Sequence, residues 1–138
     1  KWVKQSIHYW CPDTKEHKFL GQNVTVAILD TGISPHPDFK GRILSFRDFS
    51  STTGSSEKVL FSFSHFSPLI DNSGHGTHVA GILAGSGLLS SGTYAGIAPF
   101  CNLIIGKVLD QNGNGSIKNV INGIQWIRDI YTQFHIRI

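Results

Sequence analysis

Alternating apolar positions predict a strand near the start of the chain, over residues 23–29. One side of this strand would carry Val24, Val26 and Ile28, and the other side Thr25, Ala27 and Leu29. Both sides are nearly free of polar residues, which is typical of a parallel strand covered on both faces of its sheet. Apolar runs over residues 42–49 and 102–109 predict two further strands.

Apolar residues at spacings of three and four predict two helices. The first covers residues 74–84 and would place three apolar residues on one face, namely Val79, Ile82 and Leu83. The second begins after Ser116, a good N-cap, and its apolar stripe is formed by Ile117, Val120, Ile121, Ile124, Ile127 and Tyr131. Residues 132–138 alternate again, so we expect another strand to begin there.

The order of these elements (strand, strand, helix, strand, helix, strand) is typical of an α/β protein with a parallel sheet between helix layers. Residues 23–138 are therefore predicted to form part of one such domain. Residues 1–22 mix charged and aromatic residues and are predicted to be an N-terminal arm or helix.

Residues 50–70 are interpreted as an insert. Residues 50–58 are rich in serine and threonine and predict turns, whereas Phe61 and Phe63 alternate with serines in a short strand pattern. Three interpretations of residues 59–70 stay open: a surface loop without function, a rim that contacts an extended substrate, or a locally corrupted sequence.

Composition narrows the class of protein. With 138 residues, 40% apolar and 15% charged, the chain fits one modest globular domain. Basic residues are scattered, so the net charge of +3 indicates no nucleic-acid partner, and no apolar run is long enough to indicate a membrane partner. Cys11 and Cys101 lie in no metal-binding pattern, and two free thiols are favoured over a disulfide. The chain begins at Lys1 and contains no methionine, so we expect residue 1 not to be the translation start; a signal peptide or propeptide is left open.

An aspartate and a histidine stand where the predicted elements would bring them together. Asp30 ends the first strand, and His75 opens the first helix between two glycines. A carboxylate that orients a histidine forms two thirds of a hydrolytic triad. His75 would be the general base and then the general acid, and Asp30 would fix the tautomer of its ring. An aspartate before a Thr-Gly pair can equally be a turn or a cap.

Metal binding is the main alternative for His75 and His78. Their spacing is i, i+3, whereas the zinc-protease motif has histidines at i, i+4 with a glutamate after the first; Gly76 stands in that place. We therefore predict no metal site, and His78 is interpreted as a packed, hydrogen-bonded helix histidine.

The glycine-rich segment Gly113-Asn114-Gly115 lacks both the third glycine of the dinucleotide motif and the Gly-Lys of a P-loop. It predicts a tight turn before a helix. Its bare backbone groups could pair with an extended peptide by strand addition.

Several motifs together resemble the subtilisin-like serine proteases (subtilases, peptidase S8 family). Val26-Ala27-Ile28-Leu29-Asp30-Thr31-Gly32-Ile33 followed by His36-Pro37-Asp38-Phe39 is similar to the block around the family's catalytic aspartate. Asn72-Ser73-Gly74-His75-Gly76-Thr77-His78-Val79-Ala80-Gly81 is similar to the block around its catalytic histidine. Supporting similarities are Gly96-Ile97-Ala98-Pro99 and Lys107-Val108-Leu109-Asp110 with Gly113-Asn114-Gly115-Ser116. The resemblance covers about residues 22–138.

The resemblance implies a three-layer α/β/α sandwich with a mostly parallel sheet, and serine endopeptidase activity through an acyl-enzyme. Carried over to this chain, Asp30 and His75 are catalytic, and Leu109, Gly113, Asn114 and Gly115 bind the substrate. No cofactor is predicted. Calcium is a candidate by family only, with Asp38 at a matching ligand position. The implied partners are polypeptide substrates, with a propeptide or inhibitor as a further candidate.

The chain departs from the family pattern in one main respect. The family's Gly-Thr-Ser-Met-Ala block, which carries the nucleophile, is absent, as is the asparagine of the oxyanion hole. We interpret the chain as the N-terminal half of a subtilisin-like endopeptidase, inactive by itself. The alternative is a non-catalytic peptide-binding or inhibitory remnant. Few cysteines and a similarity to intracellular members favour the cytoplasm over secretion.

Overall fold

The computed structural model describes residues 4, 6, 20–50, 57–59 and 71–138, with the backbone alone at 57–59. Most of the predicted arm (residues 1–22) and of the predicted insert (50–70), including Cys11 and the Phe61 and Phe63 pattern, lies outside the described residues.

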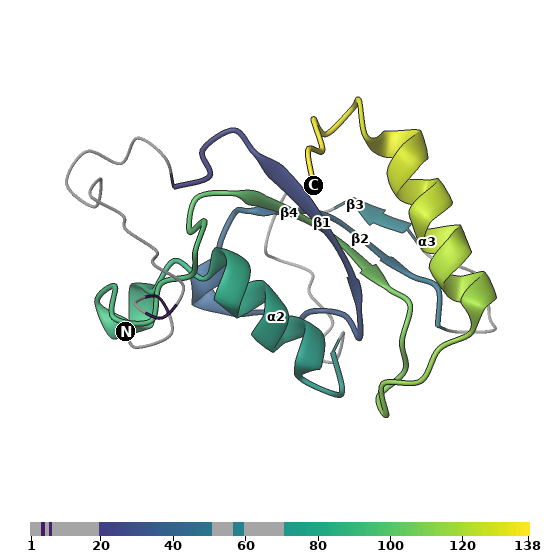
Figure 1. Ribbon diagram of the computed structural model, residues 1–138, viewed down its shortest axis with the longest axis horizontal. Helices are drawn as coiled ribbons and strands as arrows, with labels where there is room; N and C mark the ends of the chain where they lie inside the picture. The colour runs from purple at the N-terminus through teal and green to yellow at the C-terminus, as the bar shows by residue number, and fades with distance from the viewer. Residues whose placement is uncertain (1–3, 5, 7–19, 51–56, 60–70) are drawn as a thin grey trace.

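The described residues contain a four-stranded sheet in the order β1-β4-β2-β3 (Figure 1). Its strands are β1 (Thr25–Asp30), β2 (Ile43–Asp48), β3 (Glu57–Val59) and β4 (Asn102–Lys107). Strand β4 pairs in parallel with both β1 and β2, whereas β3 pairs antiparallel with β2. The predicted strands at 23–29, 42–49 and 102–109 are therefore confirmed, each slightly shifted or shortened.

Helices α2 (His75–Ala84) and α3 (Ile117–Ile130) lie on opposite faces of this sheet, as Figure 1 shows. Successive residues of β1 point to opposite faces. Ile28 belongs to the core beneath α2, and the next residue, Leu29, lies against Gly123 of α3. Short 3₁₀ helices, η2 (Pro37–Phe39) and η4 (Leu88–Ser90), flank the α2 side. The described part of the chain thus has the layers of the predicted α/β/α sandwich with a mostly parallel sheet.

The predicted apolar stripes are confirmed only in part. Val79 and Leu83 of α2 pack against the core as predicted, but the fully buried positions of both helices are other residues. Helix α2 buries Gly76, Ala80 and Ala84, while Ile82 is 57% exposed. Helix α3 buries Gly123 and Trp126, while Ile117 at its start is 81% exposed. Small residues at the contact let a helix backbone come close to the sheet, and apolar periodicity alone does not reveal this. The predicted N-cap is correct, because Ser116 Oγ accepts a hydrogen bond from Asn119 N–H at 3.1 Å.

Two further segments bear on the predictions. Residues 57–59 form β3, although 57 and 58 belong to the stretch predicted to be turns; their backbone pairs with β2. The strand expected over residues 132–138 is confirmed only at its end, where Ile136 forms a parallel bridge with Thr25. The backbone N–H of Arg137 donates to the Thr25 carbonyl at 2.9 Å, so the C-terminal residues pair with the free edge of β1.

A half-buried arginine, Arg42, ties the sheet to the C-terminal end of α2. The guanidinium of Arg42 donates to three backbone carbonyls, those of Cys101 at 2.8 Å, Ala84 at 2.6 Å and Asp38. Burial lowers the pKa of this guanidinium. Cys101 is fully buried with a free thiol, and burial raises its pKa. The prediction of a free thiol is therefore confirmed for Cys101.

Candidate active site

Three chain segments meet at the carboxyl edge of the sheet. Strand β1 ends at Asp30, α2 begins at His75, and the chain leaving β4 passes beside both. The backbone N–H groups of Val108 and Leu109 both donate to the Asp30 carbonyl, at 2.9 and 3.2 Å. This is the edge at which open α/β sheets carry their sites.

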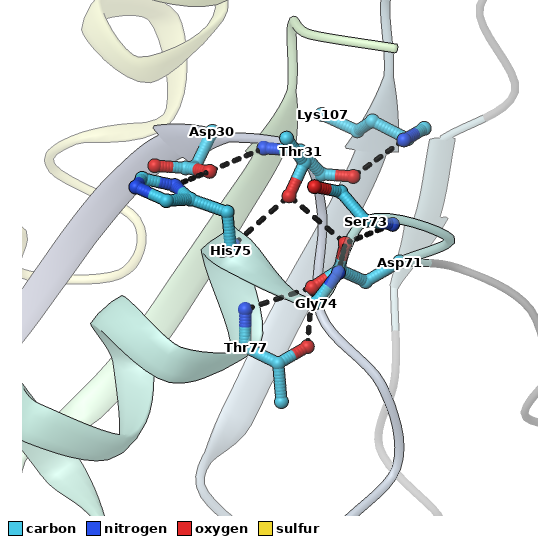
Figure 2. A network of polar contacts seen from close by, with 9 residues as sticks. Asp30, Thr31, Asp71, Ser73, Gly74, His75, Thr77 and Lys107 are labelled. Atoms are coloured by element: carbon cyan, nitrogen blue, oxygen red, sulfur yellow. Dashed lines mark hydrogen bonds and ion pairs between the residues drawn. The ribbon is translucent and has the colours of Figure 1, made fainter. Parts of the chain in front are cut away.

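The side chains of Asp30 and His75 are in direct contact (Figure 2). His75 Nδ1 lies 2.8 Å from Asp30 Oδ1, and the same oxygen accepts a hydrogen bond from Thr31 N–H at 2.7 Å. The hydrogen bond to Asp30 and the charge of that carboxylate raise the pKa of His75. The Asp30 side chain is only 12% exposed, whereas that of His75 is 64% exposed. The structure thus brings the two predicted residues together, with the imidazole facing outward.

The glycines on either side of His75 have separate structural reasons. Gly74 caps the helix with φ +84°, a left-handed conformation that favours glycine. Gly76 packs against the turn after β1. A Cβ built on Gly76 would lie 2.3 Å from the Gly32 carbonyl oxygen and 3.2 Å from Asp30 Oδ1. Gly76 therefore allows α2 to approach β1 closely enough for His75 to reach Asp30.

Asp71 is a site residue that the sequence analysis did not identify. It is 7% exposed and accepts five hydrogen bonds, from the backbone of Ser73, Gly74 and Thr77 and from the hydroxyls of Thr31 and Thr77. Burial alone would raise the pKa of Asp71, but these hydrogen bonds outweigh it and lower the pKa to about 2. The available signal was an aspartate before the Asn-Ser-Gly turn that starts the helix.

Lys107 was also missed as a member of the site. It is the last residue of β4 and pairs in register with Asp30. The residue is 9% exposed, and its ammonium donates to the carbonyl oxygen of Thr31. This contact joins the ends of β1 and β4 next to the Asp30–His75 pair.

The predicted substrate-binding turn is exposed and is organised by another missed residue, Asp110. The Asp110 carboxylate accepts hydrogen bonds from Asn112 N–H at 2.8 Å and from Asn114 N–H at 2.9 Å. Gly113 N–H donates to the Asp110 carbonyl at 3.1 Å. Some backbone groups predicted to be bare are therefore used within the turn. Among the described residues, none hydrogen-bonds to the backbone of Gly115.

The prediction for His78 was wrong. Its side chain is exposed rather than packed, and it lines a cavity of about 590 Å³ together with His36, Phe39, Ile82 and Tyr94. Within the described ranges, no group of three or more histidines, cysteines, aspartates or glutamates is placed to hold a metal ion.

No helix among the described residues combines the length and the hydropathy that a membrane crossing requires.

The family model for the Subtilase family matches residues 21–138. The fold and the paired aspartate and histidine agree with this match, and the chain belongs to the subtilase family.

Named relatives are serine proteases. Serine protease AprX of Bacillus subtilis is 47% identical over 106 residues, which are 77% of this chain and 21% of AprX. The major intracellular serine protease of the same organism is 41% identical over 108 residues, covering 77% of this chain and 30% of that protein. The chain thus spans between about a fifth and a third of the length of these relatives.

Solved structures give the same family. The CspB protease of Clostridium perfringens matches with a TM-score of 0.73 and 26% identity, covering 91% of this chain and 29% of that one. Sphericase matches with a TM-score of 0.66 and 29% identity, covering 82% of this chain and 34% of that one.

Proposed function

We propose that this chain is the N-terminal part of the catalytic domain of a subtilisin-like serine endopeptidase, with Asp30 and His75 as the acid and base of an Asp-His-Ser triad. The observation that carries the proposal is the 2.8 Å contact between His75 Nδ1 and Asp30 Oδ1. Because Asp30 takes Nδ1, the other ring nitrogen, Nε2, is left for a nucleophile. The serine would come from a segment outside these residues.

The reaction would follow from this arrangement. Nε2 of His75 takes the proton of the serine hydroxyl while the serine oxygen bonds to the peptide carbonyl carbon. His75 then returns that proton to the departing amine as the peptide C–N bond breaks, which leaves an acyl-enzyme. Water repeats the sequence and releases the acid. Asp30 stabilises the imidazolium and does not itself take the proton.

Polypeptides are the proposed substrates. Leu109 follows Asp30's partner strand, and the exposed turn Gly113-Asn114-Gly115 follows Leu109. The backbone of Gly115 is the position at which we propose that an extended peptide pairs by strand addition. A propeptide or inhibitor as a further partner and a cytoplasmic location stay predictions.

Asp38, the one candidate calcium ligand, is better suited to another role. Its Oδ2 accepts a hydrogen bond from Gly87 N–H at 3.1 Å and its Oδ1 accepts one from Leu89 N–H at 3.4 Å. These N–H groups present positive dipole ends to the carboxylate, whereas a calcium site surrounds its cation with oxygen ligands. We propose that Asp38 caps the loop after α2 and binds no cation.

A fluorophosphonate probe, which reacts with activated serine nucleophiles, tests the proposal. The full-length protein, meaning the gene product that contains this chain, should be labelled at one serine, and His75→Ala should abolish the labelling. Asp38→Asn, at the other end of α2, should be labelled normally. An unlabelled full-length protein that is folded and binds extended peptides would refute the proposal in favour of a non-catalytic peptide-binding protein.

A further inference from the structure

Five hydrogen-bond donors converge on the carboxylate of Asp71, and His75 is not among them (Figure 2). Oδ2 accepts Thr77 N–H at 2.8 Å, and Oδ1 accepts Gly74 N–H at 2.9 Å. Gly74 and Thr77 stand on either side of His75 in the chain. Asp71 thus fixes the first turn of α2, in which His75 lies, by hydrogen bonds to its backbone.

The hydroxyl of Thr31 connects Asp71 to the proposed catalytic pair, Asp30 and His75. Thr31 Oγ donates to Asp71 Oδ1 at 2.9 Å and accepts a hydrogen bond from Gly76 N–H at 2.9 Å. Thr31 N–H donates to Asp30 Oδ1, the same oxygen that His75 contacts. One residue therefore orients the Asp30 carboxylate and holds the backbone next to His75.

From this connection we propose that Asp71 is a positioning residue, which acts through the Thr31 hydroxyl to hold His75 in its hydrogen bond to Asp30. The effect on rate rests on the proposed function, whereas the effect on the geometry of the pair does not. Small displacements of a catalytic group are costly, since a misplacement of about 1 Å can reduce the rate about 100-fold.

A carboxylate suits this position better than its neutral amide. All five groups around Asp71 are donors, and an ionised carboxylate offers only acceptors. The substitution Asp71→Asn would turn an NH₂ group toward at least one of these donors. The lowered pKa of Asp71, about 2, keeps the carboxylate charged at the pH at which proteases work.

The experiment compares Asp71→Asn, Thr31→Val and Thr31→Ser in the full-length protein, with Asp38→Asn as the control carboxylate. Valine has nearly the shape of threonine without its hydroxyl, and serine restores the hydroxyl. Two quantities are measured: kcat and KM on a peptide substrate, and the pKa of His75 by NMR titration. The second needs no turnover.

We expect Asp71→Asn and Thr31→Val to lower kcat by about 10- to 100-fold with KM within about twofold. Both should lower the pKa of His75. In Asp71→Asn the loss of the Asp71 charge contributes directly, because that charge raises the pKa of His75, so Thr31→Val is the variant that reports a loosened contact with Asp30. Thr31→Ser should restore kcat and the pKa of His75 relative to Thr31→Val, and Asp38→Asn should match the wild type. If Asp71→Asn fails to fold, the Thr31 pair decides.

The inference is overturned if Thr31→Val retains the wild-type pKa of His75, or if Thr31→Ser is impaired as much as Thr31→Val. A purely structural role would lower the melting temperature alone. If the wild type shows no turnover while the pKa of His75 still falls in Thr31→Val and recovers in Thr31→Ser, the proposed function fails and the positioning role stands.

Discussion

Helix α2 is held by an aspartate at each end, and the two carboxylates differ in burial and reach. Asp71, before the helix, is 7% exposed, accepts five hydrogen bonds and connects to the Asp30–His75 pair through Thr31. Asp38, beyond the other end, accepts longer hydrogen bonds of 3.1 and 3.4 Å from loop N–H groups. Its carbonyl is held by Arg42.

The same chemical group, a carboxylate that accepts backbone N–H groups, therefore has different consequences at the two ends of α2. At the start of α2, small errors in position move His75 relative to Asp30. At the end of α2, the same errors move only the loop around η4. The start should therefore be sensitive in rate, and the end only in stability.

The largest contrast should come from the proposed catalytic pair, Asp30 and His75. His75→Ala should reduce kcat by about 10⁶-fold and Asp30→Ala by about 10⁴-fold, the order of loss known for triad members of a subtilisin. Asp38→Asn should keep kcat within about twofold. Steady-state kinetics on a peptide substrate gives all three values, and an equal loss in Asp38→Asn would break the comparison.

Two glycines within α2 provide a second test of the comparison between its two ends. Gly76→Ala should destabilise the protein by about 2–3 kcal/mol, because its Cβ would overlap the Gly32 carbonyl. Gly81→Ala should instead stabilise it by about 0.5–1 kcal/mol, since among the described residues nothing outside the helix's own backbone lies within 4 Å of that Cβ. Denaturant unfolding measures both. The same sign for both variants would contradict the contact between α2 and the turn after β1.

Acid should remove the contribution of Asp71. Its pKa falls from 3.8 to about 2 on folding, so it contributes about 2 kcal/mol of stability above pH 3.8, which is lost as the pH falls through 2. At neutral pH, Asp71→Asn should be less stable than the wild type by about this amount. The two unfolding free energies should converge near pH 2, and a constant difference across the range would refute this account.

The protonation of His75 gives a smaller effect. Its folded pKa lies above the ordinary 6.5, so turnover, which needs the neutral ring, should rise with pH through a midpoint above 6.5. The same shift stabilises the fold below the unfolded pKa, and this stability is lost as the pH rises through the folded pKa. Asp30→Asn should lower the NMR titration midpoint of His75, and an unchanged midpoint would dissociate the two groups.

The smallest effect should come from calcium at Asp38. Because N–H donors already face its carboxylate, a calcium chelator should affect the melting temperature of Asp38→Asn and of the wild type equally. Calorimetric scans with and without the chelator check this. A chelator-induced drop that Asp38→Asn abolishes would identify a calcium ligand instead.

Long motifs and alternating patterns predicted the backbone of the site. The strand ending at Asp30 and the helix beginning at His75 follow from local periodicity, and the carboxyl-edge rule brings the two together. Asp71 could not be found this way, because its partners come from separate segments and its role depends on their packing. The same holds for Lys107, which reads as an ordinary strand-end charge until its contact with Thr31 is seen.

The packing faces were harder to predict for a different reason. Periodicity weights large apolar residues, so it selected Ile82 and Ile117, both of which are exposed. The close contacts with the sheet are made at Gly76 and Gly123, where the absence of a side chain lets the helix backbone approach. The prediction for His78 failed for a similar reason. Its position in the helix does not determine whether neighbouring segments cover it or leave it lining a cavity.

The buried thiol of Cys101 can report local opening of the folded protein. A thiol-reactive dye cannot reach a fully buried sulfur whose pKa is raised, so labelling requires the core cluster that holds Cys101 to open. In a Cys11→Ser background, the labelling rate of Cys101 would count these openings. Arg42 donates hydrogen bonds to the carbonyls of Cys101 and of Ala84 at the end of α2. The labelling rate would therefore respond to loss of these contacts, and it can be measured without any turnover.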